Sequence, residues 1–183
     1  MLRISAAIPA HNEEDTVGEI VRECRASCDE VIVVDDASSD MTSEVARAAG
    51  ATVTRNPFNL GVVRSTEIGL GLASQEVIVT LDADGQHDPR FIPVVVRPIA
   101  QGLADLVLGK REHGRPLSEH VISGLTNLRV KCEDVGTGYR AFRRDLAHHI
   151  RLWGFCLCGS LMDHVRATGI TAIVVGALRM RSV

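Results

Sequence analysis

Two carboxylates one residue apart, Asp82 and Asp84, are the side chains whose type and spacing are best suited to chemistry in this chain. They follow a short apolar run, residues 77–81, of the kind that forms a buried strand. In an open α/β sheet, ligands usually bind where the strands end. Two acids this close repel each other unless a cation lies between them. With the amide of Gln86 they make a hard oxygen set suited to Mg²⁺ or Mn²⁺, and such an ion suits a diphosphate.

Two other acidic loops follow strand-like runs, at residues 9–14 (PAHNEE) and 35–40 (DDASSD). If the strands are parallel neighbours, all three loops meet at one edge of the sheet. Asp35 or Asp36 can accept a hydrogen bond from a nucleobase N–H or from ribose hydroxyls, as acids do in nucleotide-binding α/β folds. Asp40 is better interpreted as the N-cap of the next helix.

Alternating strands and helices are needed to bring these loops together. Continuous apolar runs predict strands at residues 4–9, 31–34, 51–54, 77–81, 105–109, 138–142 and 170–175. Helical spacing predicts helices at residues 15–27, 40–49, 61–74, 89–100, 117–130, 145–152 and 161–168. This alternation predicts a single α/β domain in which helices cover both faces of a mostly parallel sheet. A chain of 183 residues is long enough to bury such a core.

The composition argues against several classes of protein. A formal net charge of −3 and an aromatic content of 3% provide neither the basic surface nor the stacking side chains of a nucleic-acid-binding protein. No stretch approaches the roughly 20 apolar residues that span a bilayer, and the amino terminus lacks the apolar core of a signal peptide. We therefore expect a cytoplasmic protein, and a peripheral contact with the membrane stays open. The five cysteines, an odd number, predict buried thiols rather than a disulfide framework.

Several motifs, taken in order and spacing, resemble the family 2 glycosyltransferases of the GT-A fold. They are residues 8–14 (IPAHNEE), 33–40 (VVDDASSD), 59–61 (NLG) and 81–87 (LDADGQH). A later segment, residues 134–144 (DVGTGYRAFRR), resembles the polyprenyl-phosphate (dolichyl-phosphate) mannose and glucose synthases. The resemblance covers about residues 3–145. Each motif alone is weak, but together in register they are specific.

The resemblance implies a role for individual residues. The implied nucleotide-sugar contacts are Pro9, His11, Asn12, Glu13, Asp35, Asp36, Gly61 and Asp82. Among these, His11 stands where the family usually has tyrosine. The implied metal ligands, for Mg²⁺ or Mn²⁺, are Asp82, Asp84 and Gln86. The implied catalytic residues are Asp84, Arg111 and Arg140.

The implied reaction moves a hexose from a GDP-mannose or UDP-glucose type of donor to a polyprenyl or dolichyl phosphate at the membrane surface. It is a metal-dependent, inverting displacement at the anomeric carbon. Arg111, Arg140 and Arg143 would bind phosphate oxygens, because a guanidinium does so in bidentate fashion. A phosphate acceptor is already an anion and needs little base catalysis. A sugar hydroxyl would need a carboxylate base, for which Asp134 is the candidate.

The resemblance is incomplete in the second half of the chain. Ser160 stands where the synthases usually have an acid, and the stretch after Lys110 is shorter than theirs. We expect one catalytic domain over residues 1–183, with the nucleotide-sugar and metal half in residues 1–110 and a shortened acceptor half in residues 111–183.

Three alternatives stay open. One is a catalytically silent, nucleotide-sugar-binding subunit, and a second is a family 2 transferase that acts on a sugar hydroxyl in polysaccharide or glycan synthesis. A sugar-phosphate nucleotidyltransferase is less favoured, because its first loop is typically Gly-rich and basic whereas this one is acidic. A homo-oligomer or a membrane-bound partner also stays open.

Overall fold

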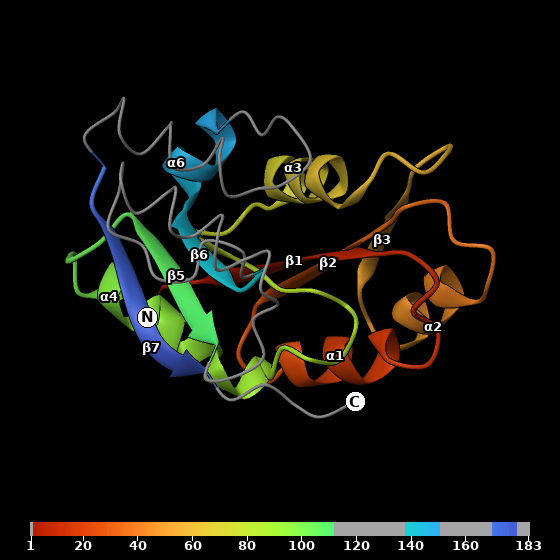
Figure 1. The fold of residues 1–183 in the computed structure, drawn as a ribbon, viewed down its shortest axis with the longest axis horizontal. Helices are drawn as coiled ribbons and strands as arrows, with labels where there is room; N and C mark the ends of the chain where they lie inside the picture. The colour runs from red at the N-terminus through yellow and green to blue at the C-terminus, as the bar shows by residue number, and fades with distance from the viewer. Residues whose placement is uncertain (1, 112–137, 151–169, 179–183) are drawn as a thin grey trace, which may run out of the picture.

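A single seven-stranded sheet runs through the part of the chain that the computed structural model describes, residues 2–111, 138–150 and 170–178 (Figure 1). The strands are β1 (Ile4–Ala10), β2 (Glu30–Asp35), β3 (Thr52–Arg55), β4 (Val77–Thr80), β5 (Leu106–Arg111), β6 (Arg140–Arg143) and β7 (Ala172–Leu178). Their order across the sheet is β3-β2-β1-β4-β6-β5-β7. Only β6 among them is antiparallel to its neighbours, so the predicted mostly parallel α/β sheet is confirmed.

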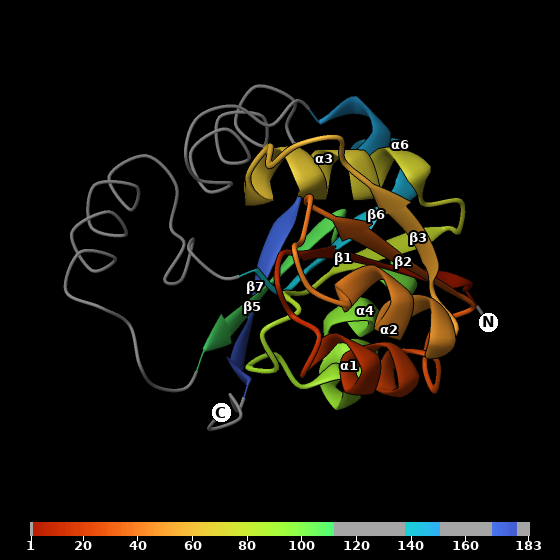
Figure 2. The same cartoon turned by 90° about the vertical axis from the view of Figure 1, so that its right-hand side faces the viewer.

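Helices cover both faces of this sheet (Figure 2). The face below β1 carries α1 (Val17–Cys24), α2 (Thr42–Ala48) and α4 (Ile92–Ala100), which follows the short 3₁₀ turn η1 (Pro89–Phe91). The opposite face carries α3 (Val62–Leu72) and α6 (Arg144–His149). Because side chains alternate along a strand, Ile8 packs into the first layer and Ala7 into the second. This double burial explains why the central strands are continuously apolar.

The position of β6 is the main feature that the sequence did not indicate. The strand predicted at residues 138–142 is found at Arg140–Arg143, and it lies between β4 and β5 with Thr80 opposite Arg140. A strand from the second half of the chain therefore completes the sheet of the first half. The helices predicted at residues 117–130 and 161–168 lie outside the described residues.

Met41 rather than Asp40 occupies the N-cap position of α2, but the Asp40 carboxylate still accepts a hydrogen bond from the Thr42 N–H at 3.0 Å.

Cys24 is buried and Cys28 is half-buried, and both are free thiols. Burial raises the pKa of Cys28 to about 12. In the described part of the chain, no helix combines the length and the apolar character needed to cross a bilayer.

Helix α3 packs so closely on the sheet that two of its glycines should respond in opposite ways to a methyl group. A Cβ on Gly69 would lie 3.2 Å from Ala7 Cβ and 3.4 Å from Val34 Cγ2, whereas a Cβ on Gly71 would meet nothing within 4 Å. Gly71→Ala should therefore raise the free energy of unfolding by about 0.5–1 kcal/mol, the gain in helix propensity. Gly69→Ala should not raise the free energy of unfolding, because overpacking against Ala7 and Val34 offsets the gain in helix propensity.

Urea unfolding of both variants and the wild type measures this difference. Equal free energies of unfolding for Gly69→Ala and Gly71→Ala would show that α3 does not press on β1 and β2 as described.

Candidate active site

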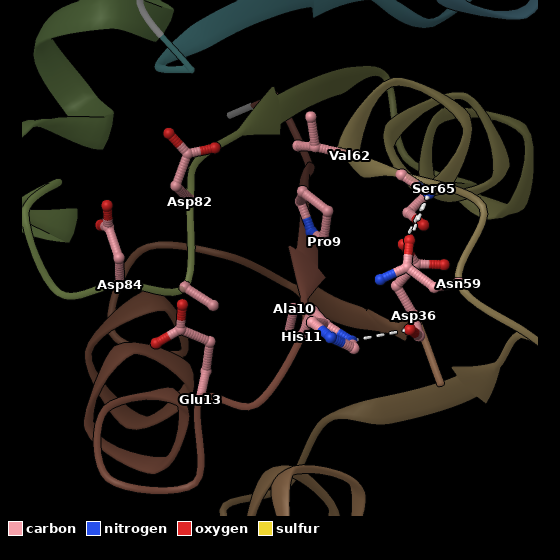
Figure 3. A pocket seen from close by; sticks show the side chains of 12 residues that line it. Pro9, Ala10, His11, Glu13, Asp36, Asn59, Val62, Ser65, Asp82 and Asp84 are labelled. Carbon is pink, nitrogen blue, oxygen red and sulfur yellow. Dashed lines mark hydrogen bonds between the residues drawn. The ribbon is translucent and has the colours of Figure 1, made fainter. Parts of the chain in front are cut away.

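The three acidic loops meet at one edge of the sheet, as predicted, because β2, β1 and β4 are parallel neighbours. A pocket of about 240 Å³ opens there. It is lined by Pro9, Ala10, His11, Glu13, Asp36, Asn59, Gly61, Val62, Ser65, Asp82, Ala83 and Asp84. Figure 3 shows the carboxylates of Glu13, Asp82 and Asp84 at one end of the pocket, and Asp36 at the other. The pocket thus has an acidic end and a separate end beside the start of α3.

Asp36 lies at the end of the pocket beside the start of α3, where several N–H groups bind its carboxylate. Its Oδ1 accepts hydrogen bonds from Asn56 Nδ2 and from the Leu60 N–H, and its Oδ2 accepts one from the Gly61 N–H, each at 2.8 Å. Burial alone would raise the pKa of Asp36, but these hydrogen bonds outweigh it and hold the pKa below its ordinary value. The Ser65 side chain also hydrogen-bonds to this carboxylate, which forms the polar wall at this end of the pocket.

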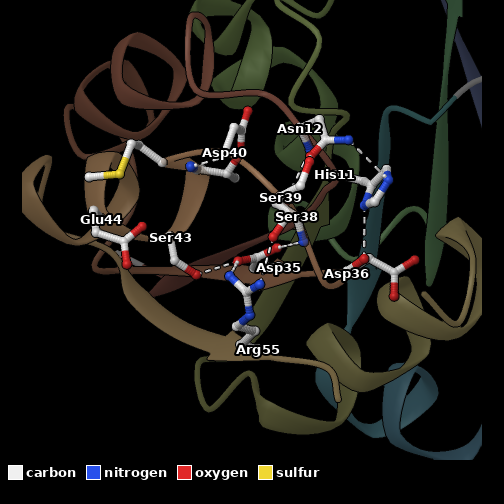
Figure 4. Close-up of polar contacts among 12 residues, drawn as sticks. His11, Asn12, Asp35, Asp36, Ser38, Ser39, Asp40, Ser43, Glu44 and Arg55 are labelled. Atoms are coloured by element: carbon white, nitrogen blue, oxygen red, sulfur yellow. Dashed lines mark hydrogen bonds and ion pairs between the residues drawn. The ribbon is translucent and has the colours of Figure 1, made fainter. Parts of the chain in front are cut away.

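Asp35, in contrast, is turned away from the pocket (Figure 4). Its carboxylate is fully buried and accepts hydrogen bonds from the Ser38 N–H at 2.8 Å, from the Ser43 hydroxyl, and from Arg55 Nη1 at 3.0 Å. Burial opposes ionisation, but the bonds from Ser38 and Ser43 and the charge of Arg55 keep the pKa of Asp35 below its ordinary value. The described contacts of Asp35 are therefore structural, and they hold the loop after β2.

Asn12 is also placed beside the pocket rather than in its wall. Its Oδ1 accepts hydrogen bonds from the Ser39 N–H at 2.7 Å and from the Ser39 hydroxyl at 3.1 Å, and its own N–H donates to Ser38 Oγ at 2.9 Å. The loops after β1 and β2 are thereby fastened together. Asn12 and Ala37 both have positive φ, at 57° and 59°. Asparagine tolerates that region, whereas alanine does so at a cost, which marks this junction as locally strained.

His11 lies in the pocket wall with both ring nitrogens engaged. Nδ1 is 2.8 Å from the Asp36 carbonyl oxygen, and Nε2 is 3.3 Å from Asn12 Nδ2 (Figure 4). A carbonyl only accepts and an amide nitrogen only donates, so we assign Nδ1 as the donor and Nε2 as the acceptor. The two contacts fix the orientation of the ring in the pocket wall.

The acidic end fits a divalent cation. Among the described residues that line the pocket there is no lysine or arginine. Burial and repulsion from Asp84, Asp40 and Asp82 raise the pKa of Glu13 above its ordinary value, although the Thr16 hydroxyl counteracts them. Within the described part of the chain, the acidic side chains thus repel one another at this end of the pocket.

The residues present fit an ion that is shared with a ligand. Within the described ranges, no group of three or more His, Cys, Asp or Glu could enclose a metal ion. Mg²⁺ usually binds through one or two carboxylates together with substrate phosphates. Asp82 and Asp84 are such a pair, whereas Gln86 is exposed and does not line the pocket. The Gln86 N–H instead donates to Asp84 Oδ1 at 2.9 Å, which fixes the turn.

His87 holds the backbone of Asp82 in place. The Asp82 N–H donates to His87 Nδ1 at 3.0 Å, and the same nitrogen lies 3.4 Å from Asp82 Oδ2. Nδ1 cannot accept from the N–H and donate to the carboxylate at once. A backbone N–H can only donate, so we assign Nδ1 as the acceptor and the shorter contact as the hydrogen bond. With Nδ1 as the acceptor, the 3.4 Å approach to Oδ2 is not a hydrogen bond, and His87 acts by holding the backbone of Asp82.

The two predicted arginines are placed differently from the carboxylates. Arg140 is 1% exposed in β6, opposite Thr80, and it does not line the pocket. Arg111 is the last residue of β5, whose carboxyl end lies at the same edge of the sheet as those of β1, β2 and β4. The acceptor-side residues Asp134 and Ser160 lie outside the described residues.

Sequence reasoning missed Asn56 and Ser65. Asn56 Nδ2 bridges Asp36 Oδ1 at 2.8 Å and Ser65 Oγ at 2.9 Å, and both residues are buried. Asn59 and Val62 also line the pocket and were not named as contacts. The sequence signal that could have identified Asn56 is its place directly after β3, because β3 is a further parallel strand that ends at the same edge of the sheet.

Acid should weaken the fold through Asp35 and Asp36. Both have folded-state pKa values below the ordinary one, so their stabilisation is complete above the pKa of an unfolded aspartate, about 3.9. It is lost as the pH falls toward the folded-state values. Urea unfolding from pH 7 to pH 3 should give a free energy of unfolding that drops steeply below about pH 4. Asp35→Asn should show a shallower drop, and an identical pH profile for the two proteins would contradict the assignment.

Comparison with known proteins supports a family assignment. A family model described as glycosyl transferase family 2 matches residues 5–151. A dodecaprenyl-phosphate galacturonate synthase of Rhizobium johnstonii is 27% identical over 175 residues, which cover 84% of this chain and 51% of that protein. An undecaprenyl-phosphate 4-deoxy-4-formamido-L-arabinose transferase of Pseudomonas fluorescens is 31% identical over 164 residues, 78% of this chain and 47% of that protein. The chain spans about half the length of these curated relatives.

A solved structure shows the same fold. It is glucosyl-3-phosphoglycerate synthase from Mycobacterium tuberculosis in complex with Mn²⁺, UDP-glucose and phosphoglyceric acid. The TM-score is 0.81 at 26% identity, and the match covers 100% of this chain and 73% of that one.

Proposed function

The chain belongs to glycosyl transferase family 2, and from that premise we propose that it transfers a sugar from a nucleotide-sugar donor to a polyprenyl phosphate. The observation that carries the proposal is the two-ended pocket. Asp36 forms the polar wall of one end, and Asp82 and Asp84 lie at the acidic other end, where none of the described lining residues is a lysine or arginine. A nucleoside diphosphate sugar has a matching layout, with hydrogen-bond donors on its base and ribose and a diphosphate that needs a cation.

In this proposal the pocket residues divide between binding the nucleoside and holding the metal ion. Asp36 binds the nucleoside, with Gly61 and His11 shaping the wall around it, and Pro9 and Glu13 complete the donor site. Asp82 and Asp84 hold Mg²⁺ or Mn²⁺, which when bound would neutralise charge on the leaving diphosphate. The relative solved with Mn²⁺ and UDP-glucose supports this choice of ion and donor class.

The acceptor attacks the anomeric carbon directly, with inversion of configuration. Its phosphate oxygen is already anionic, so no general base is required from the protein. We propose that Arg111 contacts phosphate at the mouth of the site, and that the buried Arg140, opposite Thr80 at the end of β4, acts electrostatically. Donor and metal recognition then fall within residues 1–110, and acceptor recognition within residues 111–183.

Polyprenyl phosphate is preferred as the acceptor because the two curated relatives carry polyprenyl-phosphate names. The solved relative was crystallised with phosphoglyceric acid, so a phosphate-bearing acceptor is the feature in common. A polyprenyl phosphate resides in the membrane, and the proposal therefore implies a peripheral encounter at its cytoplasmic face.

Two measurements test the proposal. Thermal shifts with UDP- and GDP-sugars, with and without Mn²⁺, should identify one donor whose stabilising effect depends on the ion. Transfer of radiolabelled sugar from that donor should then occur to polyprenyl phosphate and not to phosphoglyceric acid. Donor binding with no transfer to either acceptor would instead favour the silent nucleotide-sugar-binding subunit.

A further inference from the structure

We propose that Gly138 is a positioning residue for the cation site, because the absence of a side chain there sets the direction of the Asp82 carboxylate. The inference rests on the proposed function, in which Asp82 is a metal ligand. A Cβ added to Gly138 would lie 2.2 Å from Asp82 Oδ2 and 2.5 Å from Asp82 Oδ1. Real Cβ contacts essentially never fall below 3.0 Å, so a methyl group and this carboxylate cannot occupy their present places together.

The backbone around Gly138 is held on several sides and cannot easily yield. Thr80 Oγ1 donates to the Gly138 carbonyl at 2.8 Å, which fastens the segment to the end of β4. The Gly109 N–H donates to the Tyr139 carbonyl at 2.9 Å, which fastens it to β5. The Tyr139 hydroxyl donates to the Asp88 carbonyl at 3.1 Å. Two strands and one loop thus fix the position of Gly138 against the metal motif.

The backbone of Asp82 is held as firmly as that of Gly138. Its N–H donates to His87 Nδ1 at 3.0 Å, and the His87 ring, 3% exposed, packs on the ring of Tyr139 with 5.4 Å between centroids. With both backbones fixed, a side chain at residue 138 would have to be accommodated by rotation of the Asp82 carboxylate. Mg²⁺ requires its ligands at about 2.0–2.1 Å in nearly octahedral geometry, so a rotation that moves an oxygen by about 1 Å removes the ligand.

This arrangement makes the second half of the chain part of the cation site, although it contributes no predicted ligand there. Gly138 lies just before β6, the strand that inserts between β4 and β5. The two halves of the chain are therefore coupled at Asp82 through a close contact.

The test compares Gly138→Ala with Gly71→Ala, a glycine whose Cβ would meet nothing within 4 Å. Mn²⁺ affinity is measured by electron paramagnetic resonance, together with Tm and with nucleoside diphosphate binding in the absence of metal. Gly138→Ala should weaken Mn²⁺ binding by about 10- to 100-fold, the range for outer residues that orient metal ligands. Its metal-free binding of nucleoside diphosphate should stay within about twofold of wild type, since Asp36 is untouched. A purely structural defect would weaken both equally.

Thr80→Val is the second variant, in case Gly138→Ala does not fold. It removes the hydroxyl that fixes the Gly138 carbonyl and should weaken Mn²⁺ binding by a smaller factor. Crystal structures of the metal-free wild type and variant provide a readout that needs no ion, because the Asp82 carboxylate should be rotated in Gly138→Ala. Wild-type Mn²⁺ affinity or an unmoved Asp82 in that variant would overturn the inference. If the wild type itself binds no Mn²⁺, the metal part of the proposed function fails, while the crystal structures still decide whether Gly138 directs Asp82.

Discussion

Asp84→Asn is expected to lower the rate of sugar transfer at saturating donor by about 100- to 1,000-fold, the loss typical of removing one group that stabilises transition-state charge. Asparagine has nearly the same shape and keeps an Oδ1 that can accept the Gln86 N–H, now 2.9 Å from Asp84 Oδ1. The turn should therefore persist while the charge and one ligand oxygen are lost. Initial transfer rates, measured over a range of Mn²⁺ concentrations, test this prediction.

Asp15→Asn is the matched control, because Asp15 is exposed and does not line the pocket. That variant should keep the wild-type rate, and Asp84→Asn should keep the wild-type Tm. A transfer rate for Asp84→Asn within a few fold of wild type would show that this carboxylate is not part of the reaction, and the cation assignment would be withdrawn.

Asp36→Ala should lower the free energy of unfolding by about 3–5 kcal/mol and abolish donor binding. Three N–H donors, from Asn56, Leu60 and Gly61, now point at its carboxylate at 2.8 Å. Asp36→Ala removes the acceptor of these three N–H groups. Asp36 is only 3% exposed, so water cannot easily replace the carboxylate, and each unsatisfied N–H costs about 1–3 kcal/mol. Urea unfolding measures the first effect, and calorimetric titration with nucleoside diphosphate measures the second.

Asp145→Ala serves as its control. The Asp145 side chain is 65% exposed and pairs with Arg143 at 2.9 Å, an interaction of the kind that is worth about 0–1 kcal/mol. The two aspartates differ mainly in burial and in the number of N–H donors they satisfy. If Asp36→Ala were no more destabilising than Asp145→Ala, the network around the start of α3 would not hold that helix in place.

Much of the fold could be predicted because its signals are local. Strands β1, β2 and β4 are mostly apolar and buried, and they are bounded by acidic or Gly-containing loops. Parallel strands with right-handed crossovers leave little freedom in where their loops end, so the sequence predicts Asp36, Asp82 and Asp84 at one edge of the sheet.

The position of β6 could not be predicted in the same way. Its four residues carry no mark of strand direction, and its partners Val77 and Leu106 are distant in sequence. Antiparallel pairing with both neighbours is decided by the space that remains between β4 and β5 once the helices have packed. The contact between Gly138 and Asp82 could not be predicted from the sequence either, because it exists only after β6 has paired with β4 and β5.

Asp35 and Asp36 illustrate the division most clearly. The sequence by itself determined that two adjacent acids follow β2 at the edge where ligands bind, because strand length and polarity are written in consecutive residues. Only the tertiary structure decided which of them faces the pocket. Successive side chains leave a strand on opposite sides, and Asp35 meets Ser43 and Arg55 on one side while Asp36 meets Asn56 and Gly61 on the other. The partners that make one acid structural and the other a donor-binding candidate come from segments that only the packed fold brings within hydrogen-bonding distance.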